Sequence, residues 1–131
     1  MASSALIWEM VKRNNCYLLK NSGKCFTREP NNLTGRNTFV HSGLAQKQTV
    51  GIVADKSGKG VHLVTKKPKS VGRPAKAYNK VSLTRGNRRA MTTIKKTLKQ
   101  GKYRPGLCKA ALKRASAVLR SQKPVGAEIR K

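Results

Sequence analysis

Residues 49–65, with the sequence TVGIVADKSGKGVHLVT, contain two short β-rich runs separated by a polar turn. The first run is 49–54, the turn is 55–60 and the second run is 61–65. Runs of valine, isoleucine and threonine favour strands, and a glycine-containing turn between two such runs is typical of a β-hairpin. This segment therefore predicts the antiparallel pair around which the rest of the chain folds.

The residues before this hairpin predict a second hairpin and one helix. Residues 15–20 predict a strand, 21–24 a turn and 25–27 a returning strand. Residues 3–13 predict a short helix, because serines that can cap it are followed by apolar residues at helical spacing. Together these elements predict an α+β fold, a small antiparallel sheet of hairpins with the N-terminal helix covering one face.

The residues after the hairpin are much more basic. Residues 66–76 hold two prolines and five cations without an apolar pattern, so they predict an extended basic arm or linker. Residues 77–84 have the composition of one further strand. From about Asn87 and again from Pro105, apolar residues recur at spacings of three and four, which predicts two C-terminal helices.

These segments predict three consecutive parts within one small protein. Residues 1–65 form an α+β module, 66–84 a basic extended arm or linker, and 85–131 a basic helical extension. The last residues, 121–131, lack a core-forming pattern and are expected to fray without a partner.

The charge of the chain points to a polyanionic partner. Its 131 residues include 30 Lys and Arg but only 4 Asp and Glu, which gives a formal net charge of +26. Most of this charge lies in residues 59–131, which carry 22 cations and one acid. A compact protein with this imbalance repels itself unless an anionic partner neutralises it. Nucleic acid is the first candidate partner and an anionic membrane surface the second.

The rare acids and cysteines argue against catalytic and metal sites. The acids are too scattered for paired-carboxylate chemistry, and no cysteine pair has the CxxC spacing of a zinc site. We therefore expect a protein that is not an enzyme, with no cofactor, metal or small-molecule substrate. No signal peptide or membrane-length apolar run is present, so we expect an intracellular protein without a membrane partner. The residues concerned are Glu9, Glu29, Asp55, Glu128, Cys16, Cys25 and Cys108.

The C-terminal helices are the predicted nucleic-acid surface. Residues 85–123 contain no acid, whereas solvated helix faces normally mix both signs of charge. Exposed aromatic residues are too few for a base-stacking platform, so we expect contacts to backbone phosphates with little base readout. Tyr103, between two cations, is the one stacking candidate. The predicted contacts in this part are Arg85, Arg88, Arg89, Lys95, Lys96, Lys102, Tyr103, Arg104, Lys109, Lys113, Arg114, Arg120 and Lys123.

Two other segments supply candidate contacts. The loop at 29–35 is rich in asparagine, proline and glycine, and we expect Asn31, Asn32 and Arg36 to contact RNA there. In the basic arm we expect Arg73 and Lys76 to do so. The tripeptide at 72–74, Gly-Arg-Pro, also matches the core of an AT-hook, which leaves a minor-groove DNA-binding protein as an alternative.

Several motifs along nearly the whole chain resemble one family, the eukaryote-specific large-subunit ribosomal protein family twenty-eight. The resemblance is densest near the C-terminus and is specific because the matching runs are long. The matching motifs are Glu29-Pro30-Asn31-Asn32-Leu33, Arg36-Asn37, Ser42-Gly43-Leu44, Thr49-Val50-Gly51, Gly58-Lys59-Gly60-Val61, Lys102-Tyr103-Arg104-Pro105, Arg114-Ala115-Ser116-Ala117 and Leu119-Arg120-Ser121-Gln122-Lys123-Pro124-Val125.

This resemblance implies a structural component of the cytosolic large ribosomal subunit. Its partners would be the large-subunit ribosomal RNA and neighbouring large-subunit proteins, and it would pass through the nucleus and nucleolus during assembly. The resemblance also implies a small α+β protein with a basic helical extension. Because a related domain occurs in a nucleolar ribosome-assembly factor, an assembly factor is the alternative within the same biology.

Overall fold

A computed structural model describes residues 2–70 and 72–123. Within these residues Cα packing separates two compact units. The first contains residues 2–51 and the described part of 64–79, and the second contains 52–63 and 80–123. The predicted fraying of the tail falls mostly on residues outside the described part of the chain.

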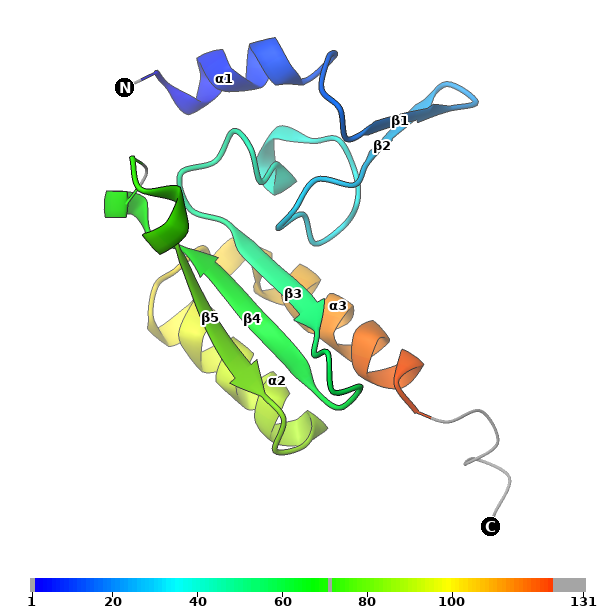
Figure 1. Ribbon diagram of the computed structural model, residues 1–131, viewed down its shortest axis with the longest axis vertical. Helices are drawn as coiled ribbons and strands as arrows, with labels where there is room; N and C mark the ends of the chain where they lie inside the picture. Colours follow the sequence, from blue (N-terminus) through cyan, green and yellow to red (C-terminus); the bar gives the residue numbers. More distant parts are fainter. Residues whose placement is uncertain (1, 71, 124–131) are drawn as a thin grey trace. The chain divides into compact units, whose positions relative to one another are not determined.

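The first unit begins with the predicted helix and hairpin. Helix α1 spans Ser4–Val11, and the Oγ of Ser3 accepts a hydrogen bond from the Leu6 amide (3.2 Å), as a capping serine should. Strands β1 (Leu18–Asn21) and β2 (Lys24–Thr27) pair antiparallel (Figure 1). The two residues between them have φ angles of 45° and 76°, the left-handed values that a tight two-residue hairpin turn requires. Both elements confirm the prediction.

The second predicted hairpin is the centre of a three-stranded sheet. Strands β3 (Val50–Ala54), β4 (Val61–Lys66) and β5 (Tyr78–Leu83) are ordered β3-β4-β5. The strand expected at 77–84 is therefore present as β5, and the α+β class is confirmed. Each of these strands has residues in both units, so the units interleave in sequence. The division into the parts 1–65, 66–84 and 85–131 stays a prediction.

The arm at 66–76 is not extended. Two short 3-10 helices occupy it, η2 (Pro68–Ser70) and η3 (Pro74–Lys76), each starting at a proline. The Lys67 amide donates to the Ala77 carbonyl oxygen (2.7 Å) and closes the segment into a loop between β4 and β5. The expectation of an extended arm was wrong because proline's fixed φ also suits a turn, and the two flanking strands bring the ends of the segment together.

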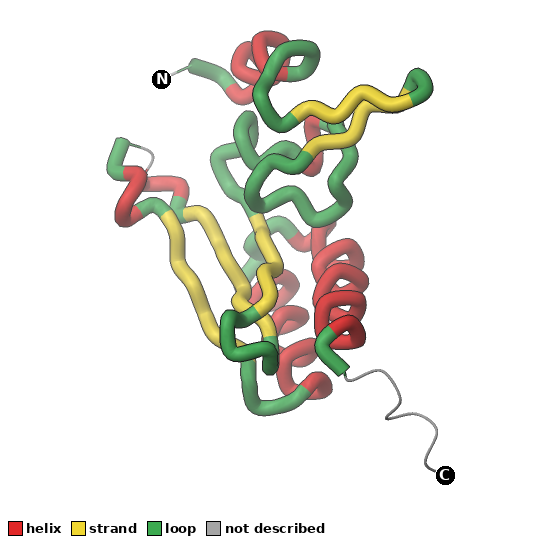
Figure 2. The backbone as a smooth tube through the Cα atoms, turned by 45° about the vertical axis from the view of Figure 1, so that its right-hand side comes forward, coloured by secondary structure: helices red, strands yellow, loops and turns green. Residues whose placement is uncertain are grey.

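The C-terminal half is helical as predicted and supplies the core of the second unit. Helix α2 spans Asn87–Lys95 and continues as a π-helical turn, η4 (Lys96–Gln100); a 3-10 turn, η5 (Pro105–Leu107), leads into α3 (Cys108–Ser121). Figures 1 and 2 show α2 and α3 side by side on one face of the strand residues of this unit. The buried side chains are Ile52, Val61, Leu63, Ala90, Ile94, Leu98, Leu107, Cys108, Ala111, Ala115 and Leu119.

The helices that cover a sheet face are therefore α2 and α3. The expectation that the N-terminal helix does so was wrong, because none of the residues of α1 is buried. Its apolar residues are spread around a short helix, and Leu6 and Met10 stay 54% and 70% exposed. The two C-terminal helices instead carry long stripes of apolar residues at spacings of three and four, which bury far more surface. In the described residues, no helix combines the length and apolarity needed to cross a membrane.

Candidate nucleic-acid interface

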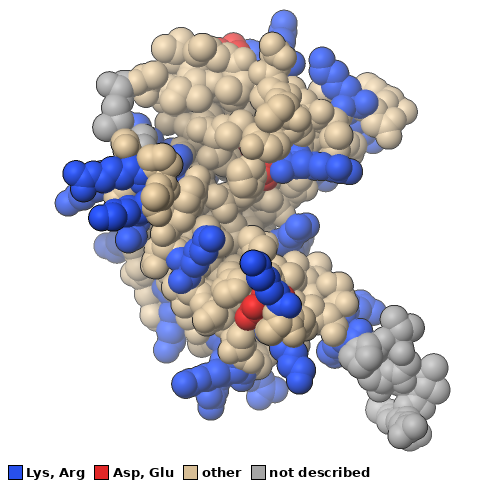
Figure 3. Space-filling model, viewed as in Figure 1, with Lys and Arg blue, Asp and Glu red and all other residues tan. Residues whose placement is uncertain are grey.

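The predicted phosphate contacts of the second unit lie on α2, on α3 and in the turns next to them. Every cation in this set is exposed except Arg104, which is half-buried, as is Tyr103. Figure 3 shows Lys and Arg side chains projecting over much of the visible surface with few acidic atoms between them. The residues are Arg85 before α2; Arg88, Arg89 and Lys95 on it; Lys96 on η4; Lys102, Tyr103 and Arg104 before η5; Lys109, Lys113, Arg114 and Arg120 on α3; and Lys123 after it.

Helix α3 shows how the sequence produces a basic surface. Ala111, Ala115 and Leu119 recur every four residues and are buried. The charged residues of the helix are Lys109, Lys113, Arg114 and Arg120, and all four are exposed. An amphipathic helix whose charged positions are all cations presents a positive face to solvent.

The turn before α3 has an unusual backbone. Lys102 and Arg104 have φ angles of 49° and 52°, in the left-handed region that non-glycine residues seldom adopt. The Arg104 carbonyl oxygen accepts a hydrogen bond from the Leu107 amide (3.0 Å), which starts η5. This sharp turn holds the Tyr103 side chain half-buried between two cations. Stacking of Tyr103 on a base stays a prediction.

Asn32, one of the expected RNA contacts, forms hydrogen bonds within the loop at 29–36 of the first unit. Asn32 Nδ2 donates to Glu29 Oε1 (2.8 Å) and to the Arg36 carbonyl oxygen (3.0 Å). Asn32 Oδ1 accepts from the amides of Thr34 (3.0 Å) and Gly35 (2.9 Å). Asn32 is thus the hub of the loop. The side-chain oxygens of asparagine commonly bond local amides, which is the signal that could have indicated this role.

Glu29 is a buried acid in a protein that has few acids. It is 7% exposed, and its two carboxylate oxygens accept from Asn32 Nδ2 and, at 3.3 Å, from Ser42 Oγ. Asn31 adopts a left-handed φ of 61° beside the backbone of β3. Arg36 is exposed, so it is the member of the predicted loop contacts that is open to solvent. RNA contact by Asn31, Asn32 and Arg36 stays a prediction.

We expect Asn32→Ala to lower the free energy of unfolding by about 2 kcal/mol, because several hydrogen bonds of the loop are lost and Glu29 is left partly unsatisfied. The measurement is urea unfolding followed by circular dichroism. Asn14→Ala is the matched control, because Asn14 is exposed in the segment after α1. If Asn32→Ala weakened RNA binding while the unfolding curve stayed unchanged, this structural role would be refuted.

The candidate contacts in the β4–β5 connection are both exposed. Arg73 directly precedes η3 and Lys76 ends it; the Arg73 amide donates to Ser70 O (3.1 Å) and the Lys76 amide to Arg73 O (3.0 Å). An AT-hook places its arginine in the minor groove on an extended backbone. Here the Arg73 amide closes a turn with Ser70 and η3 begins at Pro74, so the tripeptide does not lie in a continuous extended stretch and the geometry gives the AT-hook interpretation no support.

The other described acids are also engaged. Glu9 on α1 pairs with Lys12, the residue directly after the helix (Oε2 to Nζ, 2.5 Å). The Ser57 amide, which donates to Asp55 Oδ1 (3.2 Å), lowers the pKa of that carboxyl, and nearby His62 (3.4 Å) lowers it further. The described residues hold no cluster of three or more His, Cys, Asp or Glu side chains that could bind a metal. The cationic surface is therefore the chemical feature that stands out.

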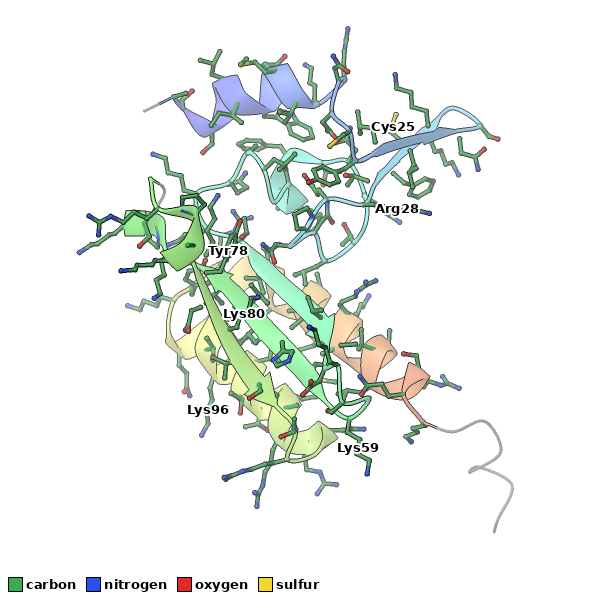
Figure 4. All side chains as sticks on the ribbon, viewed as in Figure 1. Cys25, Arg28, Lys59, Tyr78, Lys80 and Lys96 are labelled. Carbon is green, nitrogen blue, oxygen red and sulfur yellow. The ribbon has the colours of Figure 1, made fainter. Side chains whose placement is uncertain are left out.

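Four described, exposed cations of the second unit were not among the predicted contacts. Lys56 and Lys59 lie at the β3–β4 turn, Lys80 on β5 and Lys99 on η4 (Figure 4 labels Lys59 and Lys80). Lys59 belongs to one of the family-like motifs, Gly58-Lys59-Gly60-Val61, and that was the available signal. In the sequence, the same residues are typical of a plain hairpin turn, so nothing local sets this lysine apart.

Comparisons of this chain with known proteins all point to one protein family. The model of the ribosomal L28e protein family matches residues 6–121. A curated relative, the large ribosomal subunit protein eL28 of Schizosaccharomyces pombe, is 39% identical over 127 residues, covering 93% of this chain and 94% of the relative. The eL28 proteins of Dictyostelium discoideum and Caenorhabditis elegans are each 34% identical, covering 95% and 92% of this chain and 95% and 90% of theirs. The resemblance found in the sequence motifs is confirmed, and this chain belongs to the ribosomal L28e protein family.

Proposed function

We propose that this protein is a structural constituent of the cytosolic large ribosomal subunit and that it binds the large-subunit ribosomal RNA through backbone phosphates. The observation that carries the proposal is the acid-free cationic surface of α2 and α3 in a chain of the ribosomal L28e protein family. Three relatives that match nearly the full length of the chain are large ribosomal subunit proteins by name.

The charge of the chain fits a role inside a ribonucleoprotein particle. Arginine can hold two phosphate oxygens with its planar fork, and lysine can follow a phosphate as a movable point charge. Ribosomal RNA offers phosphates at high density, which offsets the self-repulsion of a +26 chain. The function needs no cofactor or small-molecule substrate, and we propose a non-enzymatic role.

The first unit suits contacts with neighbouring large-subunit proteins. Several of its apolar side chains stay exposed, with Leu6 at 54%, Val40 at 55% and Met10 at 70%. Leu6 and Met10 belong to α1 and Val40 to the 3-10 turn η1 (Phe39–His41), and the rings of Trp8 and Phe39 join these two elements with centroids 6.0 Å apart. A contiguous exposed apolar patch is typical of a protein–protein contact. We further propose that the protein passes through the nucleus and nucleolus, where it would join the assembling subunit.

Sedimentation of cell extract on a gradient tests the proposed function. The tagged full-length chain is followed through polysomes and then through subunits separated by removing magnesium. We expect it to co-sediment with polysomes and with mature large subunits. Restriction to precursor particles would favour the assembly-factor alternative, and recovery only at the top of the gradient would overturn the ribosomal role.

A further inference from the structure

Three hollows surround the turn between β5 and α2 in the second unit. The largest, about 560 Å³, lies between the end of β5 and α2, with Arg85 and Arg89 among its lining residues. The second, about 270 Å³, is lined by Lys59 and Lys123 and shares Leu83 and Thr84 with the first. The third, about 230 Å³, is lined by Arg120 and shares Lys123 with the second. The hollows therefore adjoin through common wall residues.

The walls of the three hollows carry charge of only one sign. Five cations line them and no lining residue is acidic: Lys59, Arg85, Arg89, Arg120 and Lys123. All five are exposed at the surface. The largest hollow adds the hydroxyl groups of Ser82, Thr84 and Thr93. A cleft lined by one sign of charge focuses the electrostatic field, so a cation there attracts an anion more strongly than one on a convex helix face.

The uncharged side chain of Gln122 acts as a brace that joins two of the segments that line the second hollow. Gln122 Nε2 donates to the Gly60 carbonyl oxygen (2.8 Å), and the Gly60 amide donates back to Gln122 Oε1 (2.9 Å). These two bonds tie the end of α3 to the β3–β4 turn. Gly60 has a φ of +92°, and a Cβ there would lie 2.6 Å from the Leu83 carbonyl oxygen. The turn that carries Lys59 thus packs closely against the end of β5.

We propose that the three hollows form one continuous site for an RNA phosphodiester backbone, called here the phosphate track. Its cations are Lys59, Arg85, Arg89, Arg120 and Lys123. This inference rests on the proposed RNA-binding function and deepens it: the strongest contacts come from the loops and helix ends around the β5–α2 turn. Cations along the open faces of α2 and α3 contribute less per charge. Lys59, Lys123 and Arg85 lie in three separate turns or helix ends that only folding brings together.

The chemistry of the track favours RNA over an acidic peptide. A peptide strand added to a sheet edge gains specificity from pockets for alternate side chains. The largest hollow is lined mainly by arginines and hydroxyl groups, with Leu83 and Ala90 as its apolar members. Guanidinium and hydroxyl donors match the closely spaced oxygens of successive phosphates. Competition with polyglutamate separates the two ligand classes.

The main test compares two full-length variants that lose the same charge. The track variant carries Lys59→Ala, Arg85→Ala, Arg89→Ala and Lys123→Ala. The control carries Lys95→Ala, Lys96→Ala, Lys109→Ala and Lys113→Ala, on the helix segments away from the track; Figure 4 shows Lys59 and Lys96 well apart within this unit. Binding to labelled, protein-free large-subunit ribosomal RNA is measured by fluorescence anisotropy over a range of salt, and circular dichroism checks that both variants fold.

At about 0.1 M salt we expect the track variant to lose at least about 100-fold in affinity and the control less than about tenfold. The slope of log affinity against log salt should become about three to four units shallower in the track variant, since each phosphate contact releases close to one counterion. Equal losses in the two variants would overturn the track and leave the proposed function intact. Failure of the wild-type chain to bind the RNA would overturn the proposed function itself. Equal competition by polyglutamate would overturn the assignment to RNA.

A second variant tests the brace without changing charge. Gln122→Ala removes both hydrogen bonds to Gly60, so the turn that carries Lys59 is no longer tied to the end of α3. We expect a loss of about tenfold in affinity with an unchanged salt slope, because the number of phosphate contacts is the same and only their positioning is weakened. A full-affinity Gln122→Ala protein would show that the brace does not position the track.

Discussion

The affinity of the wild-type protein for large-subunit ribosomal RNA is expected to fall at least about a thousandfold between about 50 and 200 mM salt. The reason is counterion release: each phosphate neutralised by Lys or Arg frees condensed ions, and added salt opposes that release. A protein that makes six to ten phosphate contacts shows losses on the order of 10³ to 10⁵ over this range. The exposed Lys and Arg residues of α2, α3 and the turns beside them, which have no acidic residue among them, are more than enough to make six to ten phosphate contacts.

Fluorescence anisotropy with a labelled RNA fragment, repeated at several salt concentrations, measures this slope directly. A titration at constant ionic strength, with the anion changed from chloride to glutamate, controls for specific ion binding to the protein. The phosphate-contact account would be refuted by an affinity that stays constant with salt. Such a result would point to a pocket that reads bases through neutral hydrogen bonds.

The second large effect is expected at Gly43 in the first unit. A Cβ at this position would collide with the backbone carbonyl group of Pro30, at the start of the Asn32 loop. The obstacle is backbone, so no side-chain rotation can relieve the contact. We expect Gly43→Ala to lower the free energy of unfolding by at least about 3 kcal/mol, at the upper end of the cost of overpacking a folded structure.

Gly72→Ala is the matched control, because no heavy atom lies within 4 Å of a Cβ built there. Its unfolding free energy should stay within about 0.5 kcal/mol of wild type, as is usual for surface changes. Urea unfolding followed by circular dichroism gives both values. If Gly43→Ala and Gly72→Ala unfolded at the same urea concentration, the close packing between the Pro30 and Gly43 backbones would be disproved.

The net charge of the chain can be inferred from its sequence, whereas the close packing at Gly43 cannot. The charge imbalance and its concentration after residue 58 can be counted directly, and they indicate a polyanionic partner whatever the fold of the chain. The role of Gly43 cannot be inferred from the sequence, because it depends on the backbone of Pro30, thirteen residues earlier. A loop can require glycine for several reasons, and only the folded structure shows which neighbouring atoms exclude a side chain.

Local signals were sufficient for the elements that local interactions stabilise. The capping serine of α1, the tight turn between β1 and β2, and the β-rich runs of 49–65 predicted one helix and two hairpins correctly. The stripes of apolar residues that begin near Ala90 and Leu107 predicted α2 and α3 in the same way. Each of these signals lies within a few residues of the structure that it specifies, so the amino-acid order alone is informative.

At the candidate site, local sequence signals predicted which side chains are exposed but not which distant segments meet. The sequence indicated which cations would be exposed on the helices, because the apolar stripe of α3 leaves them the other positions. It did not indicate that Lys59 lines the same hollow as Lys123, since 64 positions separate them and a pair of hydrogen bonds from Gln122 joins their segments. Likewise, the loop around Asn32 has the composition of an open RNA contact, whereas its side-chain amide bonds the loop itself.

The α+β class, the positions of most helices and strands, the cationic surface and the family could all be predicted from the sequence, because they depend on composition, on short-range periodicity and on motifs of contiguous residues. The folded structure was needed to show that α2 and α3, and not α1, cover a sheet face, that the connection between β4 and β5 contains two 3-10 turns, and that cations from three segments line adjoining hollows. Those outcomes depend on which apolar surfaces bury the most area together and on how strand pairing closes the chain between them. The free energies of this packing and strand pairing depend on residues far apart in the chain, so no short stretch of sequence predicts them.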